Sequence, residues 1–534
     1  MQAKHASAIA VLGAGLAFVV ESWVPRAHLD DAYISYRYAR NLIQGAGLVY
    51  NPGDRVEGFS NLLWTLLIAA GMALGFDAPA VAHWLGLMSG VAVLGLTWAL
   101  ASGFQGSPAW PAAVAPWIVL ASPSFVIWST CGMETPLFAA AATAALLAEQ
   151  RGRLRTAAAM AIVATLTRPD GPLLALCLFG ARLLTRPLEP RIWGRGLVAY
   201  IGAVIALTTF RLWYYGDVLP NTFYAKVGGI PLSRGVLDLW DFLLAGGFPL
   251  IVAAAEALRR DRAVRTTALY VLVTIGYVVW VGGDVFPHSR FFVAVLPALV
   301  AVAARGAGLA RTAPPLRGAA TLAGFAAAGP WFALGWLPGV ILALGVMAGW
   351  LARSRPALLP AMRWRVAAGL AIGALALWRV GSSGSPKALL ASIPRVRMVR
   401  DFAGGNAFVH ALTERTGRLL RQQDPPIHLV AAGGIGVIGW ESGLPIVDYL
   451  GLVDRSVARS RKAAAEDALL LPGHQRSDAD YVFARKPDFI VIGRTVVEGA
   501  TNLPATTAIL EHPDLARYYV WQDGPLKGFR RRPE

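Results

Sequence analysis

The stretch that decides the fold is DDAYISYRYARNLIQGAGLVYNPGDRVEGFSNLLW, residues 30–64. It follows the first membrane-length apolar segment, residues 6–24, of a chain that is 56% hydrophobic and only 15% charged. Two carboxylates, Asp30 and Asp31, open the stretch, and an aromatic and basic helix is predicted over residues 31–44. Carboxylates at a membrane surface can serve as a general base or hold a metal ion, and arginines beside them can bind a phosphate. The stretch therefore predicts a polar site beside the membrane.

The hydrophobic pattern of the 534-residue chain predicts a polytopic α-helical membrane protein. Apolar runs close to the ~20 residues that span a bilayer recur over most of the chain. We place them at 6–24, 61–76, 80–101, 109–128, 134–149, 156–168, 171–185, 196–215, 236–257, 266–282, 291–304, 318–329, 331–351 and 364–380. This pattern indicates about 11–14 transmembrane helices.

The charge distribution predicts the orientation. The net charge is +17, from 49 basic against 32 acidic residues. Much of the excess lies in short loops between apolar segments, where Lys and Arg mark the cytoplasmic side, so we attribute it to membrane topology and not to nucleic-acid binding. The basic loops expected inside are 149–155, 185–195, 258–265, 305–318 and 351–365. The linkers expected outside, together with the helix over 31–44, are 167–171, 216–229 and 282–290.

This topology contains a parity problem. Three apolar segments separate residue 60 from GMETP (132–136), yet both ends are expected outside. One of the three must fail to cross, and we expect it to be 109–128 because of its internal prolines. The first segment lacks an A-x-A cleavage site before the acidic pair, so we interpret it as an uncleaved helix. Thirteen crossings, an odd number, would place the N-terminus inside and the C-terminus outside.

After residue 385 the long apolar runs end. Short buried-strand patterns occur at 427–432, 445–450 and 488–493, with helix-compatible stretches at 402–422 and 455–470. We predict a transmembrane domain over 1–384, with a first outer loop at 25–60, and a soluble outer α/β domain over 385–534. The sequence GIGVIG (434–439) fits G-x-G-x-x-G, but the following WESGLP does not look like the opening of a helix, so we interpret it as a tight turn.

The predicted helix over 31–44 has one polar face, formed by Tyr33, Arg37, Arg40 and Gln44. Gly45 and Gly47 can end the helix. Two interpretations are open for this region. Asp30 could simply cap the helix, which would then be an amphipathic anchor in the interface plane. Alternatively, one carboxylate acts as a base and an arginine binds a phosphate.

Further ionisable residues occur at the predicted outer ends of other segments, and each alone could be an interfacial anchor. Together they bring cations and carboxylates from at least four distant segments to one side of the membrane. The sequence therefore predicts a polar cavity at the membrane surface. These residues are Glu134, Arg168, Asp170, Asn221, Tyr224, Lys226, Asp284, His288 and Arg290.

Several blocks in order carry a resemblance to a known family. They are DDAYISYRYARNL, NPGDRVEGFSNLLW, GMETPLF, TRPDG, YYGDVLPNTFYAK, GGD…RF, PIVDYLGLVDRSVAR and DADYVFARKPDFIVIG. The chain resembles the GT-C superfamily of membrane glycosyltransferases, and within it the terminal arabinofuranosyltransferase-like branch. The resemblance covers about residues 28–493, and the first block is its most specific part.

The resemblance implies an enzyme that transfers a sugar, with arabinofuranose favoured, from a polyprenyl-phosphate donor. The acceptor would be a cell-envelope polysaccharide, a lipid-linked glycan or a pilin-like protein. The reaction would invert the anomeric centre on the periplasmic side of a bacterial cytoplasmic membrane. The catalytic base would be Asp30 or Asp31. The candidates for binding the donor phosphate and sugar are Tyr33, Arg37, Arg40, Glu57, Arg168, Lys226, His288 and Arg290.

No metal site can be assigned from the sequence. The two cysteines, Cys131 and Cys177, provide no disulfide framework and no metal motif. Some members of the superfamily use a divalent metal, and the acidic pair could hold Mg²⁺ with Glu57 or Asp284 only if folding brings them together.

The alternative from another class is a transporter or flippase for a lipid-linked sugar. Transporters often show internal repeats, and we find none in this sequence. A structural scaffold, the second alternative, would not need carboxylates and arginines that converge on one side. The enzyme interpretation is therefore favoured, although the sequence does not decide which sugar or which acceptor is used.

Overall fold

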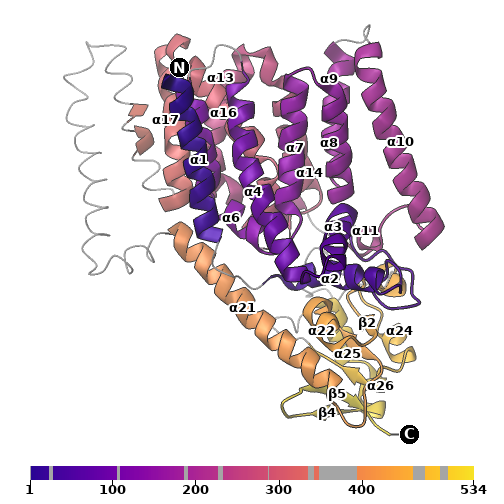
Figure 1. Cartoon of the computed structure of the whole chain (residues 1–534). Helices are drawn as coiled ribbons and strands as arrows, with labels where there is room; N and C mark the ends of the chain where they lie inside the picture. The colour runs from indigo at the N-terminus through magenta and orange to yellow at the C-terminus, as the bar shows by residue number, and fades with distance from the viewer. Residues whose placement is uncertain are drawn as a thin grey trace, which may run out of the picture.

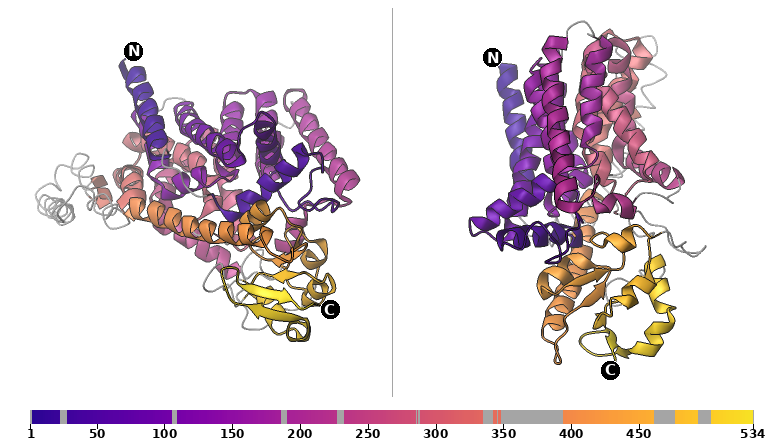
Figure 2. Two further views of the ribbon diagram at one scale, coloured as in Figure 1. Left: turned by 60° about the horizontal axis from the view of Figure 1, so that its bottom comes forward. Right: turned by 90° about the vertical axis from the view of Figure 1, so that its right-hand side faces the viewer.

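The computed structural model describes residues 2–22, 28–104, 109–185, 190–226, 232–334 without 285 and 287, 342–344, 346–347, 394–460, 476–492 and 503–533. A helical bundle forms one part of the molecule and a small α/β domain the other (Figure 1). The N-terminus and the α/β domain lie at opposite ends of the bundle, as the side view in Figure 2 also shows. The predicted segment 364–380 and most of 331–351 lie outside the described residues.

Most of the helices follow the apolar segments predicted from the sequence. Those of the bundle and its connections are α1 (Gln2–Ser22), α2 (Asp30–Ile43), α3 (Leu62–Ala73), α4 (Ala78–Ser102), α5 (Ala109–Ala121), α6 (Pro123–Thr130), α7 (Thr135–Gln150), α8 (Leu154–Thr167), α9 (Gly171–Thr185), α10 (Pro190–Tyr215), α11 (Asn221–Lys226), α12 (Leu232–Phe242), η1 (Leu243–Gly247), α13 (Phe248–Arg260), η2 (Arg262–Val264), α14 (Arg265–Trp280), α15 (Arg290–Val293), α16 (Leu296–Leu309), η3 (Ala310–Thr312) and α17 (Pro315–Leu334).

The chain is a multi-pass membrane protein. By length and composition, four helical stretches of the described part can cross a membrane: Ala78–Ser102, Gly194–Tyr215, Leu232–Arg260 and Arg262–Trp280. Helices α5 and α6, bent by 65° at the break between them, form a fifth candidate. Shorter apolar helices accompany them at Ser7–Ser22, Leu62–Ala73, Leu154–Thr167, Gly171–Leu184 and Leu296–Leu309. The total of about 11–14 crossings stays a prediction.

The structure changes our answer to the parity problem. Asn61, at the start of α3, donates a hydrogen bond to Glu134, just before α7, over 3.0 Å. The chain therefore returns to the same side between these residues. Helix α4 and the α5–α6 pair are long and apolar enough to cross, whereas the 12 residues of α3 rise only ~18 Å against a hydrocarbon core of ~30 Å. We infer that α3, and not 109–128 as expected, is the segment that does not cross.

Helix α2 confirms the helix predicted over 31–44. It lies across the end of the bundle, between the bundle and the α/β domain (Figure 1). The helix ends at Gln44, and Gly45 follows with a φ of +82°, a conformation that favours glycine. Most of α2 is buried, including Tyr33, Tyr36, Arg37 and Tyr38. The alternative of an interfacial anchor with a solvated polar face is therefore wrong.

The α/β domain is built on a five-stranded sheet in the order β2-β1-β3-β5-β4. Strands β1 (Val430–Ala432), β2 (Ile446–Asp448) and β3 (Phe489–Ile490) are parallel and confirm the three predicted strands. Strands β4 (Tyr519–Gln522) and β5 (Gly528–Arg531) add an antiparallel hairpin that was not predicted. The helices are α21 (Pro394–Arg421), α22 (Ile435–Ser442), α23 (Arg455–Ala458), α24 (Ala479–Ala484), α25 (Pro504–Leu510) and α26 (Pro513–Tyr518).

Helix α22 corrects our interpretation of GIGVIG. We expected a tight turn without a helix, but α22 begins at Ile435, inside the motif and directly after β1. The order of a parallel strand, a glycine-rich turn and a helix is that of a dinucleotide-binding unit. The structure shows below that the anion position at this helix N-terminus is taken by a side chain of the protein itself.

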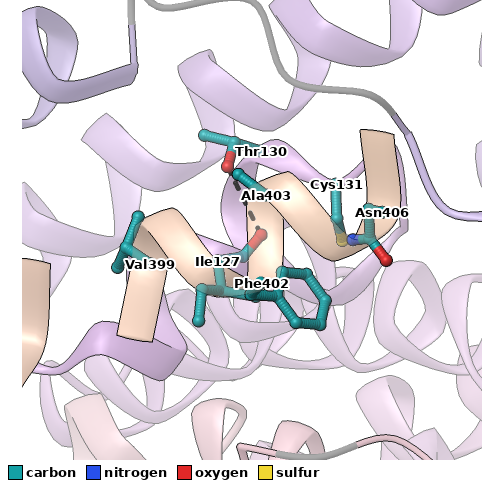
Figure 3. Close-up of a pocket in the computed structure, with 7 residues that line it drawn as sticks. All are labelled: Ile127, Thr130, Cys131, Val399, Phe402, Ala403 and Asn406. Atoms are coloured by element: carbon teal, nitrogen blue, oxygen red, sulfur yellow. Dashed lines mark hydrogen bonds between the residues drawn. The ribbon is translucent and has the colours of Figure 1, made fainter. Parts of the chain in front are cut away.

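Helix α21 confirms the helix predicted over 402–422 and connects the two parts of the molecule (Figures 1 and 2). Its first half packs on α6. Figure 3 shows Phe402 and Asn406 of α21 beside Ile127 and Cys131 at the end of α6. The domain boundary predicted at residues 384 and 385 falls before α21, outside the described residues, and stays a prediction.

Candidate active site

A cavity of about 480 Å³ opens at the end of the bundle that faces the α/β domain. Its lining comes from α2, α8, the start of α9, α10, α11, α14, α15, the loops before α3 and α7, the loops after α8, α10 and α14, and the loop after β2. Sequence reasoning predicted a polar cavity on this side, and six of its candidates line this one: Asp31, Glu134, Arg168, Lys226, Asp284 and Arg290. Arg211, which was not among the candidates, also lines it.

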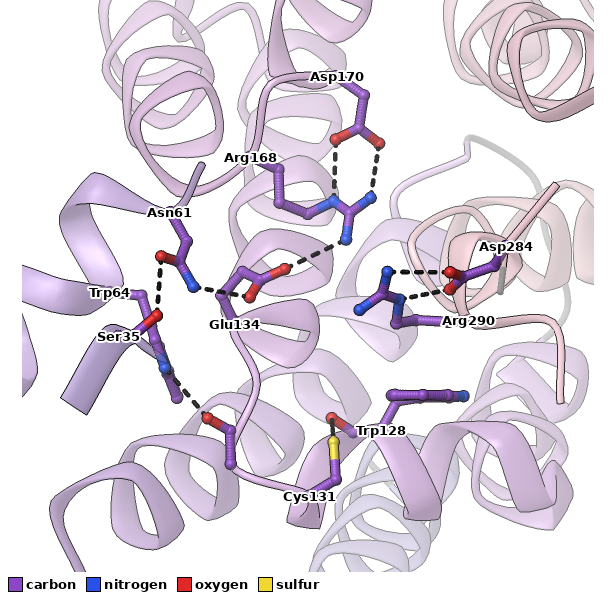
Figure 4. Close-up of polar contacts among 11 residues, drawn as sticks. Ser35, Asn61, Trp64, Trp128, Cys131, Glu134, Arg168, Asp170, Asp284 and Arg290 are labelled. Carbon is purple, nitrogen blue, oxygen red and sulfur yellow. Dashed lines mark hydrogen bonds and ion pairs between the residues drawn. The ribbon is translucent and has the colours of Figure 1, made fainter. Parts of the chain in front are cut away.

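Glu134 and Arg168 are the centre of a buried polar network (Figure 4). Arg168 Nη1 lies 3.2 Å from Glu134 Oε1, and Arg168 Nε lies 2.9 Å from Asp170 Oδ1. The second oxygen of Glu134 accepts from Asn61 Nδ2, and Ser35 Oγ donates to Asn61 Oδ1 over 3.1 Å. The loops after α6 and α8 thus present their charges already paired and oriented toward the cavity.

A second ion pair lies across the cavity. Arg290 Nε is 2.6 Å from Asp284 Oδ2, and both side chains are buried. The guanidinium carbon lies 5.3 Å from the ring centre of Trp128 (Figure 4). Arg290 opens α15, directly after Ser289, which has a positive φ. Arg290 follows this sharp turn and lines the cavity.

The third pair contains a residue that sequence reasoning missed. Arg211 of α10 donates from Nε to both oxygens of Glu57, at 2.9 and 3.1 Å. Burial raises the pKa of Glu57 to about 7, although the charge of Arg211 lowers it. Glu57 was predicted to bind the donor, whereas the structure places it behind Arg211, which itself lines the cavity. An arginine within the apolar run 196–215 was the available signal.

The α/β domain closes one wall of the cavity. Leu452, in the loop after β2, is part of the lining. Asn221, at the start of α11, donates from Nδ2 to the carbonyls of Gly451, Leu452 and Asp454 at 2.9, 3.0 and 3.3 Å. Asp448 shapes the same loop by accepting from the backbone of Leu450 and Val453. The cavity is thus shared between the bundle and the α/β domain.

Several residues of α2 predicted to bind the donor face the α/β domain. Tyr33 is hydrogen-bonded to His410 of α21 over 2.8 Å. Arg37 donates to the carbonyls of Tyr50, Gly439 and Leu444, and Arg40 donates to that of Trp440. None of these three is part of the cavity lining. Their side chains instead connect the two parts of the protein, and their predicted contact with the donor stays a prediction.

Asp30 also departs from expectation. It is the first residue of α2, but its carboxylate does not cap α2; it accepts from the backbone amides of Gly436 and Val437 in α22. The side chain of His288 likewise lies outside the cavity lining, with its ring 5.4 Å from that of Phe402. The structure thus separates Asp30 and His288 from the candidates that surround the cavity.

Two proteins of known name are similar to about half of this chain. The chain is 28% identical over 346 residues to the terminal β-(1→2)-arabinofuranosyltransferase of Mycobacterium tuberculosis, covering 55% of this chain and 54% of that protein. It is also 28% identical over 347 residues to the enzyme of the same name from Corynebacterium glutamicum, with coverage of 55% and 50%. Over these residues the chain is similar to the two terminal arabinofuranosyltransferases. It spans about half the length of the curated relatives it matches.

Two further comparisons concern the C-terminal part and the fold. A family described as a domain of unknown function (DUF8728) matches residues 405–526, which lie in the α/β part of the chain. Crystal structures of ArnT from Cupriavidus metallidurans, bound to undecaprenyl phosphate and in the apo state, are 15% and 16% identical to it. The TM-scores are 0.49 for the bound structure and 0.48 for the apo structure. Each match covers 83% of this chain and 85% of the ArnT chain.

The described residues of the chain form no group of three or more His, Cys, Asp or Glu that could hold a metal ion. Apart from Asp31, the carboxylates considered for Mg²⁺ have other partners: Glu57 pairs with Arg211, Asp284 with Arg290, and Asp30 with backbone amides. The residues present do not fit a divalent cation site that combines the acidic pair with Glu57 or Asp284. We derive no step through a metal.

Proposed function

We propose that this protein is an integral membrane glycosyltransferase that moves a sugar, with arabinofuranose favoured, from a polyprenyl-phosphate donor to a cell-envelope acceptor. One observation carries the proposal. Glu134, Asp284 and the cavity-flanking Glu57 are each paired with an arginine. The carboxylate of Asp31 lines the same cavity and makes no ion pair or hydrogen bond with the described part of the chain. Asp31 is therefore available to take a proton.

The reaction follows from this arrangement. The acceptor hydroxyl oxygen attacks the anomeric carbon of the donor sugar and gives its proton to the Asp31 carboxylate. The bond from the anomeric carbon to the phosphate oxygen breaks, and its electron pair leaves with polyprenyl phosphate. Cations that are fixed in advance stabilise the charge of the leaving phosphate without reorganisation. One displacement with a single base inverts the anomeric centre, as the resemblance implies.

The cations of the lining are candidates for this role. Arg168, Arg211, Lys226 and Arg290 all reach the cavity. The three arginines are held in place by carboxylates. Such pairs keep the guanidinium groups oriented while leaving other N–H groups to donate to a phosphate. Lys226, in the short helix α11, adds a cation next to the wall formed by Phe223 and Leu219.

The apolar part of the cavity lining fits a lipid carrier. Val204, Leu207, Val218 and Phe223 contribute apolar surface from α10 and the segment that follows it. The outward side of α10 is exposed along its length, including Ile205 and Trp213, which is expected for a helix that faces lipid. A polyprenyl chain in the bilayer could therefore reach the cavity beside α10 while its phosphate contacts the cations.

The charge pattern supports an outer location for the site. Helices α7 and α8 both reach the cavity at one end, and the basic loop 149–155 joins their other ends. The basic segment 258–265 joins α13 and α14 in the same way, with Val281, after the far end of α14, in the lining. Basic loops are typical of the cytoplasmic side, which supports a periplasmic location for the cavity and the α/β domain.

A donor panel tests the proposed function. Purified protein in nanodiscs would be offered polyprenyl-phosphate arabinofuranose and matched hexose and aminosugar donors, with a polysaccharide, a lipid-linked glycan and a pilin-like protein as acceptors. We expect release of polyprenyl phosphate only when donor and acceptor are both present. The new linkage, examined by NMR, should have the opposite anomeric configuration to the donor. Movement of intact donor across the bilayer without sugar release would instead indicate the transporter.

A further inference from the structure

Helix α2 holds α22 at both ends with charges that match the helix dipole. At the N-terminus of α22, Asp30 Oδ2 accepts from Gly436 N over 2.9 Å, and Asp30 Oδ1 accepts from Val437 N over 2.8 Å. A carboxylate at this position satisfies amide groups that lack an intrahelical partner and interacts favourably with the positive end of the dipole. The bidentate contact fixes the first turn of α2 against α22.

The other end of α22 receives positive charge from the same face of α2. Arg37 Nη1 donates to Gly439 O over 2.6 Å, and its Nη2 donates to Leu444 O over 2.8 Å. Arg40 donates to Trp440 O over 2.9 Å, with its guanidinium carbon 4.3 Å from the Trp440 ring centre. Carbonyl groups in the last turn of a helix favour cations. These contacts therefore fix which end of α22 lies beside the start of α2 and which residues of the two helices face each other.

The glycines of GIGVIG make this contact possible. A Cβ atom on Gly436 would lie 1.8 Å from the backbone oxygen of Asp30, and one on Gly439 would lie 2.0 Å from Tyr50 Oη. Gly434, in the same motif, has nothing within 4 Å of such an atom. Two of the glycines thus serve the approach of α2. Because Asp30 occupies the anion position of α22, the motif is a docking surface within this chain and not a nucleotide site.

We propose that Asp30 is a positioning residue: by holding the N-terminus of α22, it fixes the first turn of α2 so that Asp31 points into the cavity. This inference rests on the proposed function, in which Asp31 is the base. Successive residues of a helix are ~100° apart around its axis, so Asp30 and Asp31 point to different sides. A small rotation of α2 would move the Asp31 carboxylate away from the acceptor hydroxyl.

The contact is a poor source of stability, which agrees with a role in orientation. The Asp30 residue is half-buried, and burial raises its pKa to about 6, even though the hydrogen bonds from Val437 and Gly436 lower it. Keeping this group charged at neutral pH therefore opposes folding. Helix α2 has other attachments to the chain, including the hydrogen bond from Arg37 Nε to Tyr50 O.

A double-mutant cycle tests the proposal. Asp30→Asn and Gly436→Ala remove the contact from its two sides, and Gly434→Ala is the matched control within the same motif. We expect each of the first two variants to lower kcat by roughly 10- to 100-fold, because a 1 Å misplacement can cost about that much. The KM for the donor should stay within about twofold of the parent value, because neither substitution changes a residue that lines the cavity. The double variant should be no slower than the worse single one, since both changes break one contact.

Amide hydrogen exchange provides the second readout. In Asp30→Asn, the amides of Gly436 and Val437 should exchange faster than in the parent, whereas Asp31→Asn should leave them unchanged. If Asp30→Asn is as inactive as Asp31→Asn while Gly436→Ala keeps the parent's kcat, Asp30 does the chemistry and the inference is wrong. If Asp30→Asn keeps the parent's kcat, the inference is also wrong, but the proposed function stands. A parent that transfers no sugar to any acceptor rejects both.

Discussion

Glu134 and Arg168 form a 3.2 Å ion pair beside the cavity, and their side chains are only 7% and 8% exposed. They come from loops 34 residues apart that close the ends of α7 and α8. Arg168 also holds Asp170, so one guanidinium serves two buried carboxylates. The cavity is therefore bordered by groups whose charges are balanced before any substrate arrives.

Replacing Arg168 tests this balance. We expect Arg168→Leu to destabilise the protein by ~3–5 kcal/mol, because it leaves buried carboxylates without a counter-charge. Thermal unfolding in detergent would measure the loss. Arg418→Leu, which removes an exposed ion pair with Glu414 in α21, is the control and should change stability little. An Arg168→Leu protein as stable as the parent would contradict this account.

Asn221 is predicted to secure the wall formed by the α/β domain. Its side chain is 2% exposed and donates to three carbonyls of the loop 451–454. Asn221→Ala should cost about 1–3 kcal/mol, because buried carbonyls lose their donor. Asn221→Asp should be worse, since a carboxylate oxygen would face the same carbonyls. Equal stability of the two variants, measured by thermal unfolding, would show that the donated hydrogen bonds are unimportant.

Glu57 should make donor binding depend on pH. Its pKa is raised from 4.5 to about 7, chiefly by burial. A raised carboxyl pKa means that the folded protein binds this proton more tightly than the unfolded chain does. Protonation of Glu57 therefore stabilises the folded state fully below pH 4.5, and this stabilisation is lost as the pH rises through about 7. Below pH 7 Glu57 is neutral and leaves the charge of Arg211 uncompensated for the donor phosphate. The KM for the donor should therefore rise several-fold between pH 6 and pH 8.

The variant Glu57→Gln should abolish that dependence and keep the low KM across the range. Glu149→Gln is the matched control, because Glu149 pairs with Arg182 at the end of α7 that is opposite Glu134 and the cavity. It should retain the pH profile of the parent. A Glu57→Gln protein with the parent's profile would assign the titration to another group.

Arg37 should matter for stability and not for donor affinity. The side chain is 1% exposed, and its hydrogen bonds go to the backbone carbonyls of Tyr50, Gly439 and Leu444 and to the side chain of Asn51. Arg37→Met should lower the thermal transition clearly, because buried carbonyls lose a charged donor. The KM for the donor in the protein that remains folded should match that of the parent. A large increase in that KM would restore the phosphate-binding role expected from the sequence.

Much of the fold could be predicted because membrane helices are encoded locally. The apolar runs locate the helices, and the three parallel strands β1, β2 and β3 have recognisable buried patterns. The hairpin of β4 and β5 was missed because each strand has only four residues, YVWQ and GFRR, and GFRR contains a single apolar side chain. The non-crossing α3 was also missed, since its composition matches a span and only its short length and the contact of Asn61 with Glu134 show otherwise.

The sequence indicated which charged residues belong to the site, but not which of them form ion pairs with each other. The outer ends of distant segments supplied Arg168, Lys226 and Arg290, which the fold does bring together. Arg211 was hidden in an apolar run, and its partner Glu57 lies 154 residues earlier. Adjacent residues give no local sign of which one faces the cavity. The roles of Asp30 and Arg37 depend on α22, about 400 residues later in the chain.

The central claim is that Asp31 is the base of a sugar transfer, and one comparison tests it most directly. Transfer by Asp31→Asn should be measured beside the parent, with donor binding followed separately by titration. The account predicts that Asp31→Asn folds and binds donor like the parent but loses transfer by at least 100-fold, which is the lower range of general-base contributions. Normal turnover in Asp31→Asn would contradict it.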